Sequence, residues 1–257
     1  MNSDVQLTAS VVSHGQMRLV NTLIEDLIRT ASPQMRRLVV TLNVPEPEPV
    51  RAEHAPFEVL VLRNDRRRGF GANHNRAFQH CDTPWFAVLN PDLRLPSDAL
   101  GALIAVHTAV DGLLAPLILD ATGNPADAAR KLPTPWQVAA RRLWVQRSGP
   151  DPDFDWLAGM CMIVNSEAFR RVGGFDDRFF MYCEDIDLCL RMQLAGWRLR
   201  HVTNVSVTHD ARRQSRRSAR HLSWHVTSLV RLWTSRVFWT YLCRRGQLRP
   251  LRRIERA

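Results

Sequence analysis

The amino-acid sequence predicts an α/β protein built on a mostly parallel sheet with helices on its faces. Short apolar runs alternate with amphipathic segments along the N-terminal part of the chain, an order typical of strand and helix units in a doubly wound sheet. One of these runs stops abruptly at Asn-Pro-Asp, as strands do at the edge where such sheets bind ligands. With 45% apolar residues in 257, the chain can bury a substantial core, and wholesale disorder is excluded.

The first part of the chain predicts a strand, a helix and two further strands, in that order. The strands are predicted at residues 7–15, 38–42 and 57–62, where apolar residues form short runs. Between the first two strands, apolar residues recur at helical spacing from Leu19 to Ile28, with polar residues on the other side. Pro33 is expected to close this helix.

The apolar run Trp85–Leu89 is central to the prediction because of the residues that follow it. Pro84 precedes the run, and Pro91 disfavours helix at Asn90, so the run is expected to be a buried strand that ends in a turn. Asn90 and Asp92 then offer oxygen atoms to a divalent cation at the carboxyl end of a strand. The alternative is an ordinary Asx-Pro turn.

A glycine-containing loop follows the third strand. Its residues Gly69-Phe70-Gly71 allow close backbone approach and lead into a segment that can open a helix, whose N-terminus favours anions. A dinucleotide-binding G-x-G-x-x-G motif would need a third glycine, which is missing, and would follow the first strand. A nicotinamide-dependent oxidoreductase is therefore disfavoured. The alternative for this loop is a basic, solvated connection to a helix.

More strands and helices are predicted in the second half of the chain. They are a helix capped by Ser97, strands at 112–120, 155–164 and 202–209, a helix at 166–172 that ends at Gly173-Gly174, and a partly helical excursion at about 130–152 that can shape an acceptor site. Gly159 falls in the middle of the second of these strands, where a glycine suggests close approach of a ligand or of backbone. His209 ends the last strand, on the expected ligand side.

A cluster of acidic residues, Glu184, Asp185 and Asp187, lies among aromatic and aliphatic side chains. Apolar residues at helical spacing from Ile186 onward predict a helix that ends at Gly196. Glu184 and Asp185 would occupy the first turn of this helix, where the helix dipole favours carboxylates. Capping alone is the alternative for such residues. Burial beside the upstream aromatic residues would raise the pKa of a carboxyl group toward the range useful for a general base, and we prefer this interpretation.

Composition narrows the classes of protein further. The formal net charge is +10, and nearly all of the basic residues are arginine, with Lys131 the only lysine. The five cysteines form no C-x-x-C pair and are expected to be reduced cytosolic thiols, with neither a zinc site nor a disulfide framework. No secretory signal is expected at the N-terminus, and no uncharged apolar stretch reaches the roughly 18 residues that could span a membrane.

The composition changes beyond residue 210, which divides the chain into a domain at 1–210 and a basic, aromatic-rich helical tail at 211–257. Apolar residues recur at helical spacing from Leu222 to Val237, and arginines lie on both sides of this stretch. A helix rich in Trp and Arg suits an anionic membrane surface. The alternative is that the tail packs on the domain with its arginines solvated. Nucleic acid is not an expected partner, because no recognition motif accompanies the charge.

Several short motifs occur in one order between about residue 8 and about residue 210. They are Val11-Val12-Ser13-His14, Gly69–Asn75, Leu89–Asp92, Trp156–Gly159, Gly173–Asp176, Tyr182–Leu188 and His209. This order resembles that of the family 2 glycosyltransferases, a group with the Rossmann-like GT-A fold. Within the group, it is similar to the bacterial rhamnosyltransferase-like members of lipopolysaccharide assembly. The resemblance thus implies a GT-A fold followed by a basic helical C-terminal extension.

The resemblance also implies an inverting transfer of a sugar from a nucleotide diphosphate donor, and it implies roles for individual residues. Asp92 would bind Mg²⁺ or Mn²⁺ at the donor diphosphate, since Asn90-Pro91-Asp92 takes the place of the family's DxD motif, and His209 would complete this site. Asp185 falls where the family places the general base that takes the acceptor proton, with Glu184 in support. The implied donor-binding residues are Ser13, Asn43, Asn64, Gly69, Gly71, Asn75, Asn90, Asp92, Trp156 and Gly159.

Two residues depart from the family's pattern. The family usually ends its second strand in Asp-Asn, with the Asp reading the nucleotide base, whereas this chain has Leu42-Asn43 there. Asn43 can still hydrogen-bond an imide edge. Asn90 replaces the first Asp of DxD, which lowers the negative charge offered to the metal. Asn-Pro-Asp resembles the rhamnosyltransferase subgroup, so dTDP-rhamnose is the expected donor.

Family and tail together imply a metal-dependent glycosyltransferase on the cytosolic face of the plasma membrane, bound peripherally. The acceptor would be a glycan or a polyprenyl-diphosphate-linked glycan in cell-surface polysaccharide synthesis. The alternative is a catalytically degenerate GT-A domain that acts as a basic adaptor for membranes or nucleic acid, and Asn43 and Asn90 are the residues that favour it.

Overall fold

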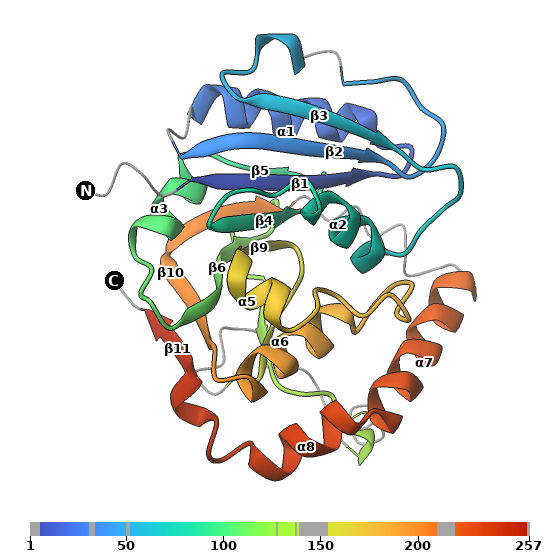
Figure 1. Cartoon of the computed structure of the whole chain (residues 1–257), viewed down its shortest axis with the longest axis vertical. Helices are drawn as coiled ribbons and strands as arrows, with labels where there is room; N and C mark the ends of the chain where they lie inside the picture. The colour runs from blue at the N-terminus through green and yellow to red at the C-terminus, as the bar shows by residue number, and fades with distance from the viewer. Residues whose placement is uncertain are drawn as a thin grey trace.

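The computed structural model describes residues 6–30, 34–49, 52–126, 128–136, 138, 154–209 and 219–255 (Figure 1). Its N-terminal half contains β1 (Leu7–Ser13), α1 (Met17–Thr30), β2 (Met35–Leu42), a 3-10 turn at Ala52–His54, β3 (Glu58–Arg63), α2 (Phe70–Phe78), β4 (Trp85–Leu89), β5 (Leu93–Arg94), α3 (Ala99–Ala105) and β6 (Asp111–Leu119). The second half contains β7 (Ala129–Arg130), β8 (Trp156–Leu157), β9 (Cys161–Asn165), α5 (Ser166–Arg171), α6 (Glu184–Leu194), β10 (Arg198–His209), α7 (Ala219–Thr234), α8 (Arg236–Arg244), a 3-10 turn at Arg249–Leu251 and β11 (Arg252–Glu255).

The centre of the molecule is a nine-stranded sheet in the order β11-β10-β6-β9-β4-β1-β2-β3, with β5 paired to β10. Neighbouring strands are parallel, except that β9 is antiparallel to both β4 and β6, and β5 is antiparallel to β10. The expected α/β class with a mostly parallel sheet is therefore confirmed. The carboxyl ends of β1, β2, β4 and β6 lie on the same side of the sheet. Asn90 and Asp92, which follow β4, therefore lie on the side where such sheets bind ligands, as predicted.

Helices cover both faces of the sheet. Successive side chains of a strand point to opposite faces, so each face contributes to its own buried cluster. In β4, Phe86 and Val88 belong to the cluster that contains α2, α5 and α6, whereas Trp85, Ala87 and Leu89 belong to the cluster that contains α1 and α3. All five side chains are buried, at 0–2% exposure. β4 is thus buried on both faces, which explains why its sequence is an unbroken apolar run.

Four predicted elements need correction. The strand predicted at 155–164 is two strands, because β8 pairs with β7 in a separate two-stranded sheet and the chain turns at Gly159 before β9 joins the main sheet. The N-cap of α3 is Asp98, whose carboxylate accepts from the amide of Gly101 at 2.9 Å, so Ser97 lies one residue too early. The second and last predicted strands are longer than predicted, because β2 begins at Met35 and β10 begins at Arg198.

Other predicted boundaries hold. α1, α2, α5 and α6 form at the predicted places, and Gly173, Gly174 and Gly196 adopt positive φ angles of 80°, 69° and 91° just after α5 and α6, where a side chain would strain the backbone. Pro33, most of the excursion at 130–152 and the boundary between 210 and 211 lie outside the described residues.

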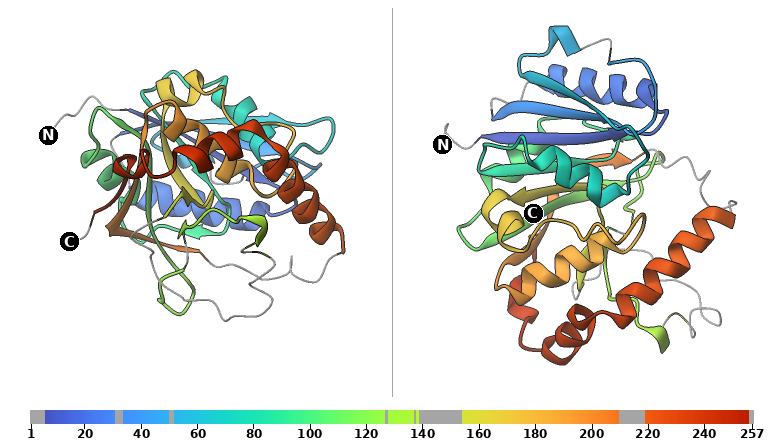
Figure 2. Two further views of the ribbon diagram at one scale, coloured as in Figure 1. Left: turned by 90° about the horizontal axis from the view of Figure 1, so that it is seen from below. Right: turned by 45° about the vertical axis from the view of Figure 1, so that its right-hand side comes forward.

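The C-terminal segment packs on the rest of the molecule, at the end opposite α1 (Figures 1 and 2). Leu232, Phe238 and Tyr241 are fully buried in the same cluster as α6, and β11 extends the main sheet beside β10. The packing expected as one alternative for the tail is thus observed. Of the helices that the structure describes, none combines the length and apolar character needed to cross a membrane.

Candidate active site

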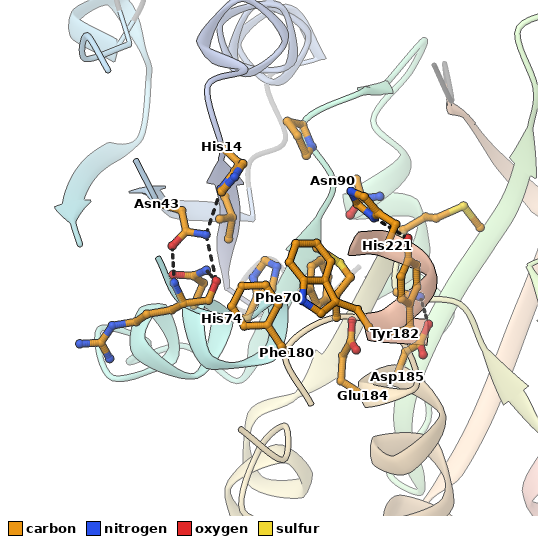
Figure 3. Close-up of a pocket in the computed structure, with 18 of the residues that line it drawn as sticks. His14, Asn43, Phe70, His74, Asn90, Phe180, Tyr182, Glu184, Asp185 and His221 are labelled. Carbon is orange, nitrogen blue, oxygen red and sulfur yellow. Dashed lines mark hydrogen bonds between the residues drawn. The ribbon is translucent and has the colours of Figure 1, made fainter. Parts of the chain in front are cut away.

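A cavity of about 740 Å³ opens at the carboxyl ends of β1, β2 and β4. Figure 3 shows that it runs from His14 and Asn43 at one end, past Phe70 and His74, to Asp185 and His221 at the other. The described residues that line it are Val12, His14, Gln16, Asn43, Arg67, Arg68, Phe70, Asn73, His74, Leu89–Asp92, Arg130, Ala158–Met160, Phe180–Tyr182, Glu184, Asp185, Ala219–His221 and Trp224. The predicted residues Asn43, Asn90, Asp92, Gly159, Glu184 and Asp185 are therefore brought together at one cavity.

Asp92 and His209 meet although they are far apart in the sequence, because β10 pairs antiparallel with β5 and sets His209 opposite Leu93. Nε2 of His209 lies 3.0 Å from Oδ1 of Asp92 and 3.3 Å from Nδ2 of the Asn90 side chain. One imidazole nitrogen cannot accept from the amide and donate to the carboxylate at once, so one of these contacts is unsatisfied. A divalent cation between the imidazole and the carboxylate would satisfy both groups.

Glu184 and Asp185 lie side by side in the first turn of α6 but differ in their hydrogen bonds. The Asp185 carboxylate accepts from the amide of Gly159 at 3.0 Å and from the amide of Ile186 at 2.9 Å. Glu184 is 5% exposed, and its Oε2 has no hydrogen-bond partner among the described residues. Burial raises the pKa of both groups, and for Glu184 the neighbouring charge of Asp185 raises the pKa further, well above its ordinary 4.5.

The backbone is strained immediately before these two acids. Tyr182 and Cys183 have φ angles of 73° and 65°, a region that residues with side chains rarely adopt. The strained turn is held from three sides. The carbonyl of Phe180 accepts from the amide of Phe70, the carbonyl of Met181 accepts from the hydroxyl of Ser228, and the phenol of Tyr182 is hydrogen-bonded to His221 at 2.9 Å. The positions of Glu184 and Asp185 therefore depend on both α2 and α7.

At the other end of the cavity, both the oxygen and the nitrogen of the Asn43 side-chain amide form hydrogen bonds. Its oxygen accepts from the amides of Arg68 and Asn64, and its nitrogen donates to the carbonyl of Arg68 and to His14. Asn64 does not line the cavity; it orients Asn43 and also donates to Asn73. Burial and the charge of Arg67 hold the pKa of His14 below its ordinary value of 6.5, so this imidazole is neutral at pH 7.

The glycines of the predicted loop are explained by close packing within the protein. A Cβ at Gly69 would lie 2.6 Å from the carbonyl oxygen of Phe180, and one at Gly71 would lie 2.6 Å from Cβ of Phe175. Neither glycine is among the residues that line the cavity. The glycines do allow close backbone approach, as predicted, but what approaches them is the protein segment before α6.

Three more of the predicted donor-binding residues lie beside the cavity, outside its lining. Asn75 donates to the carbonyl of Phe175 and accepts from the same residue's amide, so that it fastens α2 to that loop. The hydroxyl of Ser13 accepts from the amide of Gln16 at the start of α1. Trp156 is 7% exposed, and its indole donates to the carbonyl of Lys131. In this structure, all three stabilise segments that carry lining residues.

Sequence reasoning missed part of the site. Arg130, Tyr182, His221 and Trp224 line the cavity close to Asp185 or beside α7. Tyr182 belongs to the motif around Glu184, which was a usable signal. For His221 and Trp224 the sequence carries no signal, because only the packing of α7 brings residues of the tail to this cavity.

The fold and the site combine a cavity at the carboxyl ends of parallel strands with Asp92, which contacts His209, and with the acidic residues Glu184 and Asp185. The family model described as "Glycosyl transferase family group 2" matches residues 85–251. The chain belongs to this family.

Two relatives illustrate the similarity. An N-acetylglucosaminyl-diphospho-decaprenol L-rhamnosyltransferase of Mycobacterium tuberculosis is 35% identical over 164 residues, 56% of this chain and 53% of that protein. The chain thus matches about half the length of that relative. Rhamnosyltransferase WbbL of Escherichia coli is 28% identical over 242 residues, 86% of this chain and 90% of that protein.

Solved structures confirm the GT-A fold class. A mannosyltransferase from Pyrobaculum calidifontis, in complex with GDP-Man and Mn²⁺, aligns with a TM-score of 0.65 at 17% identity and covers 96% of this chain and 71% of its own. GalNAc-T7 with UDP, GalNAc and Mn²⁺ aligns with a TM-score of 0.62 at 18% identity and covers 81% of this chain and 43% of its own. At these identities the likeness concerns the fold.

Proposed function

We propose that this chain is an inverting glycosyltransferase that moves L-rhamnose from dTDP-rhamnose to a lipid-linked glycan acceptor. The observation that carries the proposal is the placement of Asp92, which contacts His209, on the same cavity as Asp185, at the carboxyl ends of the central strands. The names of the two rhamnosyltransferase relatives support the sugar, and the acceptor in the mycobacterial name supports a diphospholipid-linked N-acetylglucosamine.

The residues present fit a metal that is held jointly with the donor. Among the described residues, no three His, Cys, Asp or Glu side chains gather as a metal site, so the protein offers Asp92 and His209, with Asn90 beside them. Mg²⁺ and related ions are often held in this way, by one or two protein ligands and substrate phosphates. When bound, the ion would neutralise the charge that grows on the leaving diphosphate.

Asp185 is the proposed general base. Its two backbone donors favour the ionised carboxylate and fix its orientation, while burial raises its pKa and makes it a stronger base. Burial and the charge of Asp185 raise the pKa of Glu184 well above its ordinary value, so Glu184 is more easily kept neutral, which limits the repulsion between the two acids. A single displacement at the sugar carbon, with Asp185 taking the proton of the acceptor hydroxyl, inverts the anomeric configuration.

The tail is proposed to bind an anionic membrane surface, where a lipid-linked acceptor resides. Leu222, Val226 and Val230 are 67%, 52% and 51% exposed and follow each other at four-residue spacing on one face of α7. The net charge of +10 is complementary to anionic lipid. These features support a peripheral position on the inner face of the plasma membrane.

The test is transfer of radiolabelled rhamnose from dTDP-rhamnose to a short-chain N-acetylglucosaminyl diphospholipid, with Mn²⁺, Mg²⁺ or EDTA. We expect labelled lipid with a metal and none with EDTA, and a product whose anomeric configuration, read by NMR, is opposite to that of the donor. Absence of transfer from any member of a panel of nucleotide sugars would contradict the proposal and favour the basic adaptor.

A further inference from the structure

The first turns of α7 form one wall of the cavity at the end that contains Asp185. Ala219, Arg220, His221 and Trp224 of this helix all line the cavity. Figure 3 shows His221 beside Tyr182 and Asp185, whereas His14 and Asn43 lie at the opposite end. A segment of the C-terminal tail is therefore part of the site, on the side away from the strand ends where the donor nucleotide is proposed to bind.

The side chains of this wall form a connected aromatic surface. The rings of Phe180 and Trp224 lie 4.9 Å apart at 42°, and the rings of Trp224 and His221 lie 4.9 Å apart, edge to face at 71°. His221 is hydrogen-bonded to the phenol of Tyr182 at 2.9 Å, and Ser228, two turns further along α7, donates to the carbonyl of Met181. The surface is thus fixed before any ligand arrives, which lowers the entropic cost of binding.

We propose that this surface, the acceptor platform (Phe180, Tyr182, His221 and Trp224), binds the acceptor sugar, with the ring of Trp224 stacked on the apolar face of the pyranose. The inference rests on the proposed glycosyltransferase function and names the acceptor subsite within it. A pyranose presents C–H groups on its faces and hydroxyl groups around its rim, so it suits a large amphipathic ring beside polar groups.

Charge and position support this choice of ligand. Arg220 lines the cavity one turn before Trp224 and sets a cation beside the platform, which suits an acceptor sugar that carries a diphosphate. On the other face of α7, the exposed residues Leu222, Val226 and Val230 point away from the cavity, toward the proposed membrane. One helix can then lie on the lipid surface and receive the head of a lipid-linked acceptor.

The experiment compares Trp224→Leu, which keeps apolar bulk without a ring, with Trp224→Phe, which keeps a ring. The matched control is Trp239→Leu, because Trp239 is a half-exposed tryptophan of α8 that does not line the cavity. For each variant we would measure the KM for a short-chain N-acetylglucosaminyl diphospholipid with dTDP-rhamnose and Mn²⁺, and the Kd for dTDP with Mn²⁺.

We expect Trp224→Leu to raise the acceptor KM on the order of tenfold, as the loss of one stacked ring predicts, with the Kd for dTDP unchanged. Trp224→Phe should retain most of the acceptor affinity, and Trp239→Leu all of it. An unchanged acceptor KM in Trp224→Leu would overturn the acceptor platform but not the proposed function. An equal loss of dTDP affinity would also overturn the platform, because it would assign Trp224 to the donor site. No transfer by the unmodified chain would overturn the proposed function itself.

Discussion

Glu184 and Asp185 are neighbours in the sequence, yet their surroundings act differently on their pKa values. Burial raises the pKa of Asp185, whereas two backbone amides and the charge of Arg130 lower it. One buried oxygen of Glu184 has no hydrogen-bond partner among the described residues, and burial and the charge of Asp185 both raise its pKa. Pairs of acids whose environments separate their pKa values are typical of acid–base sites. Two predictions test this assignment.

Asp185→Asn should abolish sugar transfer and leave the affinity for dTDP and metal nearly unchanged, because the amide keeps the shape of the side chain but cannot take a proton. We would measure transfer rate and nucleotide Kd on the same preparation. Asp98→Asn is the control, since Asn also caps helices well and Asp98 lies at the remote start of α3. Equal loss of transfer and of nucleotide binding would mean that Asp185 supports the structure of the cavity.

Glu184→Gln should stabilise the protein at pH 8 relative to the unmodified chain, and the difference should close near pH 4. The folded-state pKa of Glu184 is raised, so the folded protein retains its proton longer than the unfolded chain does, and stability falls as pH rises from about 4.5 through the raised pKa. Each unit of pKa elevation corresponds to about 1.4 kcal/mol. Unfolding free energies across this pH range check the prediction. A difference that does not vary with pH would contradict it.

At the scale of single elements, the strands that the sequence predicts well are those buried on both faces. β1 and β4 are buried along almost their whole length, and both lie within two residues of the predicted bounds. The N-terminal parts of β2 and β10 were missed because they carry arginines. In β10, Arg200 is 4% exposed and pairs with the fully buried Asp111 at 3.1 Å, a partner that only the fold supplies.

The break between β8 and β9 was missed for a different reason. An apolar run shows that a segment is buried, but it does not show in which sheet each half lies. The turn at Gly159 has a consequence for the site, because it points the amide of Gly159 at Asp185. The sequence identified most of the central site residues through motifs near strand ends, whereas the contribution of α7 depends on tertiary packing alone.

Asp155 is the connection between the C-terminal elements and β8. Its carboxylate is fully buried and accepts from the phenol of Tyr241 at 3.0 Å, from Arg245 at 2.7 Å through two nitrogens, from Arg252 at 2.9 Å and from the amide of Leu132 at 2.8 Å. Two guanidinium groups, one of them only 3% exposed, thus pair with the charge of Asp155.

Asp155→Asn should lower the free energy of unfolding by about 3–5 kcal/mol, because it removes a buried charge that pairs with the buried guanidinium of Arg252. It should also make the C-terminal elements more sensitive to limited proteolysis. Asp176→Asn is the control, since its partner Arg178 is 72% exposed and such pairs contribute about 1 kcal/mol or less. An unfolding free energy for Asp155→Asn equal to that of the control would contradict the proposed role.

At the scale of the whole molecule, one layered domain and its C-terminal helices form three surfaces with different proposed roles. The strand ends hold the proposed donor and metal site, the inner face of α7 contributes His221 and Trp224 to the proposed acceptor platform, and the outer face of α7 carries exposed apolar residues. We therefore expect the same helix to link membrane binding to acceptor binding. The membrane contact can be tested separately from catalysis.

Replacing Leu222, Val226 and Val230 together by Ser should abolish sedimentation with vesicles that contain phosphatidylglycerol, since burial of these side chains in the interface drives binding. Binding of the unmodified chain should weaken at high salt, because the arginines attract anionic lipid electrostatically. Val110→Ser is the control, an exposed apolar residue (45%) outside the tail. Undiminished sedimentation of the triple variant would remove α7 as the membrane contact.

The most direct test of the central claim, a shared metal and donor site at Asp92 and His209, is thermal stabilisation by nucleotide diphosphates with Mn²⁺, Mg²⁺ or EDTA. A ligand that binds only the folded state raises the apparent stability by mass action. Because the protein supplies only part of the metal's ligands, we expect dTDP with metal to raise the Tm and either component alone to have little effect. No shift with any nucleotide diphosphate in the presence of metal would contradict the account.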